Sequence, residues 1–177
     1  MLYIGLMLLV LGCSSSKKIV ATNDALDTML AEKKIEFRAN SAQPMVTYAL
    51  SQIGQSGLIA PGSTINRIDL GGSSNFLKID GDSVSARLAY YGERRLGGGY
   101  NNNNSGIEFD GVPETIEIIK DDIKKSYRIT FSITENMEIY NVTAQISPNL
   151  SGTVTIVGSH RTSIAYSGRA QALEVPE

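Results

Sequence analysis

The chain has 177 residues, with 16 Lys and Arg against 18 Asp and Glu, for a formal net charge of -2. This length is sufficient for one domain with a hydrophobic core, and the composition is typical of a globular chain. There is no basic excess that would suggest nucleic acid, and no acidic run typical of a solvated tail. We therefore expect one folded domain that does not bind nucleic acid.

The chain begins with an apolar run, MLYIGLMLLVLGC, which is too short to span a bilayer, since a spanning helix needs roughly 20 residues. Val10-Leu11-Gly12-Cys13 resembles the cleavage box of bacterial lipoproteins, and Cys13 is the single cysteine. We predict that residues 1–12 are a signal peptide and that the sulfur of Cys13 carries lipid. The alternative is a buried membrane helix or a stray apolar N-terminus, and no Lys or Arg precedes the apolar run, as it normally does in a secretory signal.

Lipidation of Cys13 predicts a mature chain with no free thiol and no internal disulfide. Residues 13–21 would then be a tether to the membrane, which the acyl chains anchor. Ser14, rather than Asp, follows the cysteine, which resembles the pattern that directs Gram-negative lipoproteins to the outer membrane. Lys17 and Lys18 stand where the export signal of Bacteroidetes lipoproteins has acidic residues. We therefore expect a protein on the periplasmic face of the outer membrane.

The first predicted element of the mature chain is a helix of about 12 residues from Thr22, because Leu26, Met29 and Leu30 follow the spacing of one apolar face. Residues 45–66 show no clear pattern, and we interpret them as a long connection. The expected strands are 35–39, 75–79, 83–88, 107–109, 115–120, 127–133, 138–146, 153–157 and 162–166.

Alternation is clearest in 127–133, where Tyr127, Ile129 and Phe131 share one face, as in an antiparallel sheet buried on one side. About seven to nine short strands with one helix predict an α+β, mainly antiparallel fold. We expect a strongly bent sheet or barrel-like sandwich with the helix packed on it. The predicted domain covers 22–168, and residues 169–177 are predicted to be a frayed tail.

The middle of the chain holds a loop rich in glycine and asparagine, GGGYNNNN. It is no phosphate-binding loop, because no Lys-Ser/Thr follows and no helix begins there. Aromatic and guanidinium side chains around it suit a sugar, an acyl chain or a peptide. Packing of the first two tyrosines at a sheet end is the alternative. The candidate binding residues are Tyr90, Tyr91, Arg94, Arg95 and Tyr100.

Several chemistries have few residues to support them. His160 is the single histidine and Cys13 is assigned to lipid, so catalytic triads and transition-metal sites have little to build on. Glu93, Glu108 and Asp110 flank the loop and offer the paired carboxylates of a glycosidase. Alternation places charged residues on the outer face of most strands, which explains them without catalysis.

Two further motifs lie in a predicted hairpin turn. Asp80 and Asp82 offer oxygen ligands for calcium, but Asp-Gly-Asp forms turns without metal. Asp82-Ser83-Val84 resembles the acceptor for periplasmic O-glycosylation in Bacteroidetes, and Ser83 is the candidate. Thr28 has the same context, but it lies within the predicted helix. We expect neither a metal nor a cofactor.

The segments DSVSARLAYYG and GIEFDG, in their order with the helix and the other strands, carry a family resemblance. The chain resembles the uncharacterised Bacteroidetes family called domain of unknown function 4251, over residues 24–168. Residues 45–62 fit least well and look like a local insertion. The resemblance implies secreted or lipid-anchored bacterial proteins without an assigned activity, so it supplies no catalytic residues.

The sequence as a whole predicts a lipid-anchored cell-envelope protein that binds a ligand, or a protein or glycan partner, without catalysis. One alternative is an envelope glycan hydrolase that uses Glu93, Glu108 or Asp110. The other is a structural assembly module whose sheet edges pair with neighbouring molecules.

Overall fold

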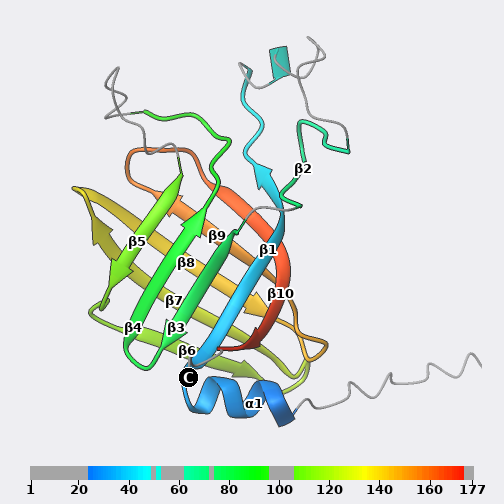
Figure 1. Cartoon of the computed structure of the whole chain (residues 1–177), viewed down its shortest axis with the longest axis vertical. Coiled ribbons are helices and arrows are strands. Elements are labelled where there is room, and N and C mark those ends of the chain that lie inside the picture. Colours follow the sequence, from blue (N-terminus) through cyan, green and yellow to red (C-terminus); the bar gives the residue numbers. More distant parts are fainter. Residues whose placement is uncertain (1–23, 49–50, 53–61, 72–73, 96–105, 174–177) are drawn as a thin grey trace, which may run out of the picture.

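A single antiparallel sheet, curled into a half-barrel, makes up most of the computed structural model, which describes residues 24–48, 51–52, 62–71, 74–95 and 106–173. One short helix lies across an end of this half-barrel (Figure 1). The elements are α1 (Asp24–Ala31), β1 (Lys34–Pro44), β2 (Ile68–Asp69), β3 (Phe76–Asp80), β4 (Ser83–Leu88), β5 (Ile107–Gly111), β6 (Ile116–Asp121), β7 (Ser126–Glu135), β8 (Glu138–Ile146), β9 (Ser151–Gly158) and β10 (Ile164–Ala172).

The strand order in the described residues is β5-β4-β3-β1-β10-β9-β8-β7-β6, with β2 beside β1. Tight turns fix the register of two hairpins. Gly81 has a φ of 62° between β3 and β4, and Asn136 and Met137 have φ of 49° and 63° between β7 and β8. Such left-handed residues give two-residue turns whose twist matches that of the strands. In this order β5 and β6 are the two edge strands of the described sheet.

The two layers of the half-barrel meet in an aromatic core. The ring of Phe109 on β5 lies 6.1 Å from that of Phe131 on β7, edge to face, and 5.7 Å from that of Tyr140 on β8. These contacts bring the first strand of the sheet order against strands near its other end. Buried aromatic pairs of this kind add about 0.5–1.5 kcal/mol to the gain from burial alone.

Helix α1 covers one end of this core. Leu26, Met29 and Leu30 are buried, as the apolar spacing predicts. The Asp27 carboxylate accepts hydrogen bonds from Lys120 Nζ at 2.6 Å and from the Tyr127 hydroxyl at 2.8 Å. The bond from Lys120 holds the pKa of Asp27 below its ordinary value. The helix is thus joined to β6 and β7 as well as to the adjoining β1.

The sequence prediction of fold class is confirmed, with corrections to several lengths. Helix α1 has 8 residues, because Lys33 adopts a φ of 52° and β1 begins beside it. The described chain has 10 strands, since the two-residue β2 carries no periodicity that could predict it. The predicted tail from residue 169 is wrong as far as Ala172, because β10 continues to that residue.

The continuation of β10 follows from its partner strand. β1 runs on to Pro44 past a register shift between Ala39 and Ser41, and Ile35 pairs with Ala172. Gly168 packs so closely on β1 that a Cβ there would lie 2.0 Å from the Arg38 carbonyl oxygen. Backbone hydrogen bonds and close approach define this segment, and neither appears in a hydrophobic pattern.

Replacement of Leu26 by Ala tests how far α1 is part of the domain. Leu26 is 1% exposed, so the cavity should lower the free energy of unfolding by about 2–5 kcal/mol, measured by urea denaturation. Thr28→Ala, at an exposed position of the same helix, is the control and should change it by less than about 0.5 kcal/mol. Equal effects of the two changes would contradict the docking of α1.

Candidate functional site

The segment from Tyr90 to Arg95 follows β4 and is held by its backbone against the turn between β9 and β10. Glu93 N donates to Thr162 Oγ1 at 3.1 Å, and Thr162 N donates to the Glu93 carbonyl at 2.9 Å. Arg95 N donates to the His160 carbonyl at 2.7 Å. The segment therefore has a fixed extended backbone even though it belongs to no named strand.

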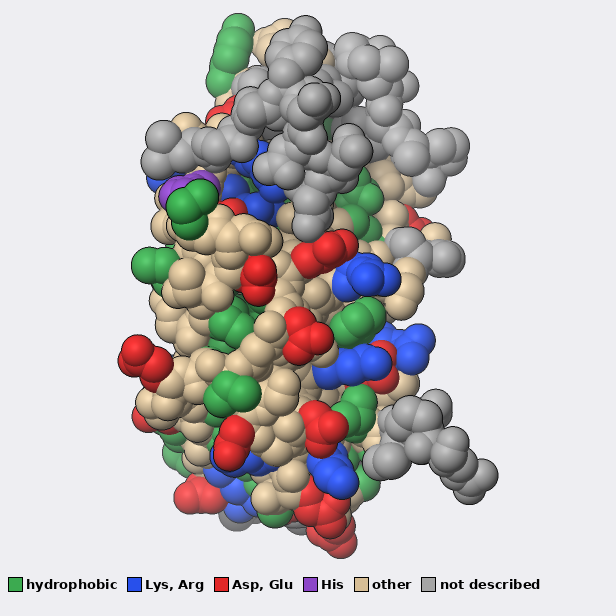
Figure 2. Space-filling view, turned by 60° about the vertical axis from the view of Figure 1, so that its left-hand side comes forward, with side chains coloured by type: hydrophobic (Ala, Val, Ile, Leu, Met, Phe, Trp, Pro, Cys, Tyr) green, Lys and Arg blue, Asp and Glu red, His purple; other side chains and the backbone are tan. Residues whose placement is uncertain are grey.

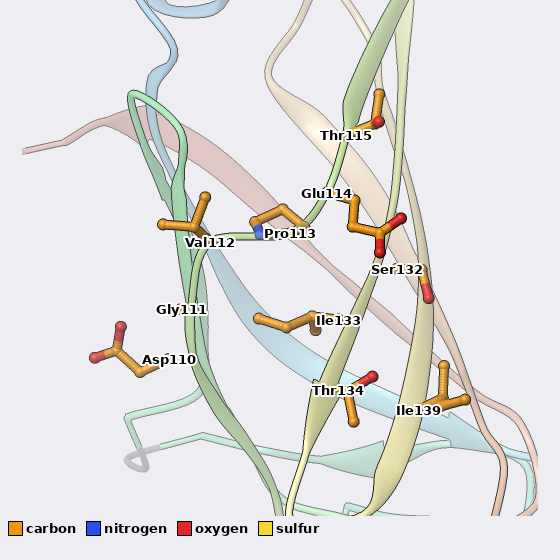
Figure 3. A pocket seen from close by; sticks show the side chains of 10 residues that line it. All are labelled: Asp110, Gly111, Val112, Pro113, Glu114, Thr115, Ser132, Ile133, Thr134 and Ile139. Carbon is orange, nitrogen blue, oxygen red and sulfur yellow. The ribbon is translucent and has the colours of Figure 1, made fainter.

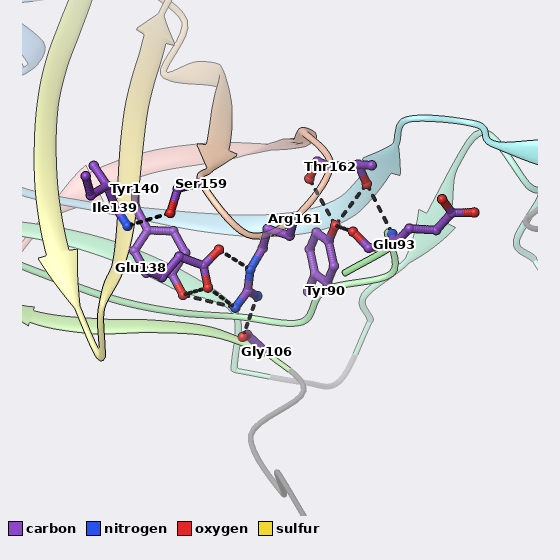
Figure 4. Close-up of polar contacts among 9 residues, drawn as sticks. All are labelled: Tyr90, Glu93, Gly106, Glu138, Ile139, Tyr140, Ser159, Arg161 and Thr162. Atoms are coloured by element: carbon purple, nitrogen blue, oxygen red, sulfur yellow. Dashed lines mark hydrogen bonds and ion pairs between the residues drawn. The ribbon is translucent and has the colours of Figure 1, made fainter. Parts of the chain in front are cut away.

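The side chains of this segment divide into two groups. Tyr91, Glu93 and Arg95 are exposed, in the alternation expected of an extended chain. Tyr90 is half-buried, and its hydroxyl lies 2.9 Å from the Glu93 carbonyl and 3.0 Å from that of Thr162 (Figure 4). Burial raises the pKa of Tyr90, which keeps its phenol protonated. Among the described residues of the predicted cluster, Tyr91 and Arg95 are therefore the exposed ones, and Tyr91 is 39% accessible.

The other predicted cluster residues have different positions. Arg94 is half-buried and forms an isolated antiparallel bridge with Arg161. Tyr100 lies outside the described residues, as does Cys13. Neither the loop GGGYNNNN nor the lipidation site can therefore be placed relative to this segment.

Beneath the segment lies a buried ion pair that the sequence prediction missed. Arg161 Nε and Nη2 each donate to a different oxygen of Glu138, both at 2.7 Å. The Tyr140 hydroxyl donates to Glu138 at 3.0 Å, and Arg161 Nη2 lies 3.0 Å from the same hydroxyl (Figure 4). The side chains of Arg161 and Glu138 are only 4% and 8% exposed. Such two-pronged geometry is the strongest form of an arginine–carboxylate pair.

The pKa values in this network follow from its burial and charge. Burial pushes the pKa of Glu138 upward, but the hydrogen bonds and charge of Arg161 outweigh it, so the pKa lies below its ordinary value. Burial raises the pKa of Tyr140 to about 12. Glu138 is thus ionised and Tyr140 protonated at neutral pH. The network has the protonation states that its hydrogen bonds require.

Arg161 also contacts residues that lie on either side of 96–105 in the sequence. Its Nη1 donates to the Gly106 carbonyl, just before β5, at 2.9 Å. Its guanidinium carbon lies 4.9 Å from the centre of the Tyr90 ring and 5.3 Å from that of Tyr140. Cation–π contacts of this kind contribute about 0.5–2 kcal/mol. One buried side chain therefore joins the turn before β10 to Gly106 and to the ring of Tyr90.

Two hollows lie elsewhere, at the edge of β5. One has a volume of about 540 Å³ and is lined by Asp110–Thr115, Ser132–Thr134 and Ile139 (Figure 3). The other, of about 330 Å³, includes Glu108 and Asp110. The described residues of the Tyr90–Arg95 segment line neither hollow.

Of the three carboxylates proposed for hydrolysis, Glu108 and Asp110 border the 330 Å³ hollow, and Glu93 lies outside it. Glu108 and Asp110 share one exposed face of β5, and Arg87 Nε lies 3.6 Å from Glu108. Glu93 belongs to the other segment, where Thr47 Oγ1 donates to it. All three carboxylates are exposed to solvent.

The remaining candidates are single residues. Ser83 begins β4 and is half-buried, with its hydroxyl 3.5 Å from the Gly111 carbonyl. The exposed Asp82 pairs with Lys33 Nζ at 2.7 Å. His160 is half-buried in the turn before β10. Among the described residues no group of three or more His, Cys, Asp or Glu side chains could hold a metal ion.

These features define a class of protein: an antiparallel half-barrel with an N-terminal helix and an exposed segment fixed over a buried ion pair. The chain belongs to the family described as Domain of unknown function (DUF4251), whose model matches residues 17–170. The resemblance predicted from the sequence is therefore confirmed. The family description assigns no activity.

A solved structure supports the fold. The crystal structure of a DUF4251 family protein from Bacteroides eggerthii DSM 20697 has a TM-score of 0.57 to this chain at 15% sequence identity. The match covers 84% of this chain and 86% of that one. No curated protein sequence matches the chain. At this identity the likeness extends to the fold alone.

Replacement of Arg161 by Met tests the buried pair. The change leaves the Glu138 carboxylate buried without its counter-ion, so the free energy of unfolding should fall by about 3–5 kcal/mol in urea denaturation at neutral pH. Glu138→Met in the same background should restore a large part of the loss, because it removes the uncompensated charge. A loss in the double variant as great as in Arg161→Met would contradict this explanation.

The same variants should differ in pH dependence. In the native protein the folded pKa of Glu138 is lowered, so its stabilisation is present above the unfolded pKa and is lost as pH falls through the folded pKa. In Arg161→Met, burial without the cation raises that pKa, so stability is lost as pH rises. The gap between the two proteins should narrow from about pH 7 to about pH 4. A constant gap would show that Glu138 does not respond to Arg161.

Proposed function

We propose that this chain is a non-enzymatic, lipid-anchored protein of the cell envelope that binds a protein or glycan partner through Tyr91 and Arg95. The site lies in the periplasm, and the lipid on Cys13 holds the domain at the outer membrane. Family membership is consistent with an envelope protein of unassigned activity. The binding and the anchor are proposals that go beyond it.

The observation that carries the binding proposal is the fixed backbone of the Tyr90–Arg95 segment. Its hydrogen bonds to Thr162 and His160 hold Tyr91 and Arg95 outward. Binding of a partner would cost little backbone conformational entropy, because the backbone that carries these side chains is already fixed. Tyrosine and arginine are also the side chains most enriched where binding energy is concentrated.

The anchoring proposal rests on the sequence. The apolar run before Cys13 is too short to cross a bilayer. Among the described residues no helix has the length and apolar character needed to span a membrane. Attachment through lipid would place the domain at the membrane surface, where its exposed segment could meet an envelope partner.

A glycan hydrolase is the less supported function. Glu108 and Asp110 do border the 330 Å³ hollow, which is the observation in its favour. Glu108→Gln would then abolish turnover of an envelope glycan by the purified protein. Unchanged glycan after incubation with the native protein would contradict hydrolysis.

Cys13→Ala should release the protein from the membrane fraction, because no sulfur remains to carry lipid. Globomycin, which blocks the lipoprotein signal peptidase, should cause the precursor to accumulate. The distribution between membrane and soluble fractions measures the first effect, and the apparent mass of the chain measures the second. Ser14→Ala is the matched control. Retention of the Cys13→Ala protein in the membrane would contradict lipid anchoring.

The double change Tyr91→Ala and Arg95→Ala should weaken binding of the envelope partner at least about tenfold, the effect of about 1.4 kcal/mol. Crosslinking in intact cells followed by recovery of the tagged chain measures the loss. Tyr48→Ala is the control, because Tyr48 is 82% exposed but lies outside the segment. Equal crosslinking by the native chain and the double variant would refute this surface as the binding site.

A further inference from the structure

The larger hollow is a groove along a strand edge with an incomplete ladder. β6 pairs with β7 from Asp121↔Ser126 up to Ile116↔Phe131. β7 continues to Glu135, and its last residues pair only with β8 in the described structure. On the side where β6 has ended, β7 faces the edge of β5 across the groove (Figure 3).

The register shows which backbone groups face the groove. The turn at Asn136 and Met137 makes Glu135 and Glu138 a hydrogen-bonded pair, so alternate residues of β7 bond to β8. Thr134 is not one of these alternate residues, so its N–H and C=O point away from β8. These groups lie on the groove side, beyond the last pair of the β6 ladder.

The same reasoning applies to the opposite wall. The tight turn at Gly81 makes Asp80 and Ser83 a hydrogen-bonded pair, so the backbone of Val84 bonds toward β5 and pairs with Gly111. Asp110 therefore directs its N–H and C=O away from β4. No strand of the described chain pairs with this edge of β5. Backbone donors and acceptors thus face the groove from both walls.

The side chains of the groove add a charge and an apolar floor. Asp110 and Glu114 are acidic, and none of the lining residues is Lys or Arg. Ile133 is 7% exposed and points from β7 toward Gly111, which has no side chain to meet it (Figure 3). Val112 and Ile139 expose apolar surface at the sides, 70% and 45% accessible.

The charge extends beyond the groove. The neighbouring hollow is lined by Glu108 and Glu135 as well as by Asp110, and Arg87 is its single basic residue. Asp and Glu side chains run down the middle of the face that comes forward in Figure 2, with Lys and Arg side chains beside them on one side. The surroundings therefore favour a cationic ligand over an anionic or neutral one.

We propose that this groove binds an extended peptide segment that contains lysine or arginine, as an added strand against the end of β7. The peptide continues the ladder that β6 leaves at Phe131, through the backbone of Thr134. Its apolar side chains contact Ile133 and Val112, and its basic side chains meet Asp110 and Glu114. This is strand addition, in which backbone bonds give affinity and side chains give specificity.

A second copy of the chain fits the groove less well than a basic peptide. Pairing of two β5 edges would bring Asp110 and Glu108 of one copy close to the same acidic residues of the other. Like charges opposite each other across a ladder destabilise it. The volume of about 540 Å³ lies within the range of ligand pockets and suits a short segment rather than a whole sheet edge.

The test uses the full chain in detergent and a short synthetic peptide that alternates lysine and valine, with a fluorescent label. Its anisotropy should report saturable binding. The same peptide with N-methyl groups on alternate residues keeps its charge but cannot form the ladder, and should bind at least about tenfold more weakly. Equal binding of the two peptides would overturn strand addition.

Protein variants locate the site. Asp110→Lys with Glu114→Lys should weaken binding of the lysine–valine peptide at least about tenfold. Glu32→Lys with Asp122→Lys makes the same change of net charge at exposed positions away from the groove and should leave it near the native value. Similar losses in both pairs, or no binding by the native chain, would refute the proposal.

Two further measurements test the folding of the variants and the oligomeric state of the chain. Thermal unfolding checks that each double variant folds, and if the groove variant does not, the N-methyl comparison on the native chain decides. Sedimentation at rising protein concentration detects a dimer. A dimer that the lysine–valine peptide fails to dissociate would assign the groove to a second copy and overturn the peptide proposal. The surface at Tyr91 and Arg95 is separate, so either site can fail alone.

Discussion

The buried pair of Arg161 and Glu138 is the contact on which the arrangement of four distant segments of the chain depends. One guanidinium joins β8, the turn before β10, the residue before β5 and the ring that follows β4. Buried ion pairs contribute little net stability when compared with apolar packing, but a broken pair is costly. The energetic penalty for misplacing any of these segments therefore explains how four distant parts of the chain share one arrangement.

The two proposed sites use different consequences of this architecture. Near Arg161, an extended segment without a full strand partner is fixed by hydrogen bonds to the opposite turn, and its alternate side chains face solvent. At the β5 edge, the sheet curls until its aromatic core closes, but the backbone ladder does not. The first is a surface of side chains, and the second is an edge of backbone groups beside acidic residues.

The acidic groove and the membrane anchor suit a common setting. An exposed strand edge is a hazard for aggregation, and charged side chains are one means by which proteins prevent it. Asp110 and Glu114 therefore serve two purposes in the proposal, since they discourage self-pairing and attract a basic partner. A lipid tether would also keep the domain near partners in the same compartment, which raises their effective concentration.

The sequence by itself determined the fold class, most strands and the family. Periodicity in β3, β4, β7 and β8 reflects one buried face, and that is a local property of the chain. The sequence also identified Tyr91 and Arg95 as candidate binding residues. It grouped them with Tyr90, whose hydroxyl donates to the Thr162 carbonyl. Local patterns could identify these residue types but not which of them stay exposed.

Only the tertiary structure decided the ion pair, the groove and the end of β10. Arg161 and Glu138 are 23 residues apart and follow no motif, so nothing local predicts that their charges are buried together. The groove arises because β6 begins only at Ile116, opposite Phe131, while β7 continues to Glu135, and because β5 comes round to the same edge. Burial and pairing between distant strands are set by how the sheet closes, which no single segment of the sequence contains.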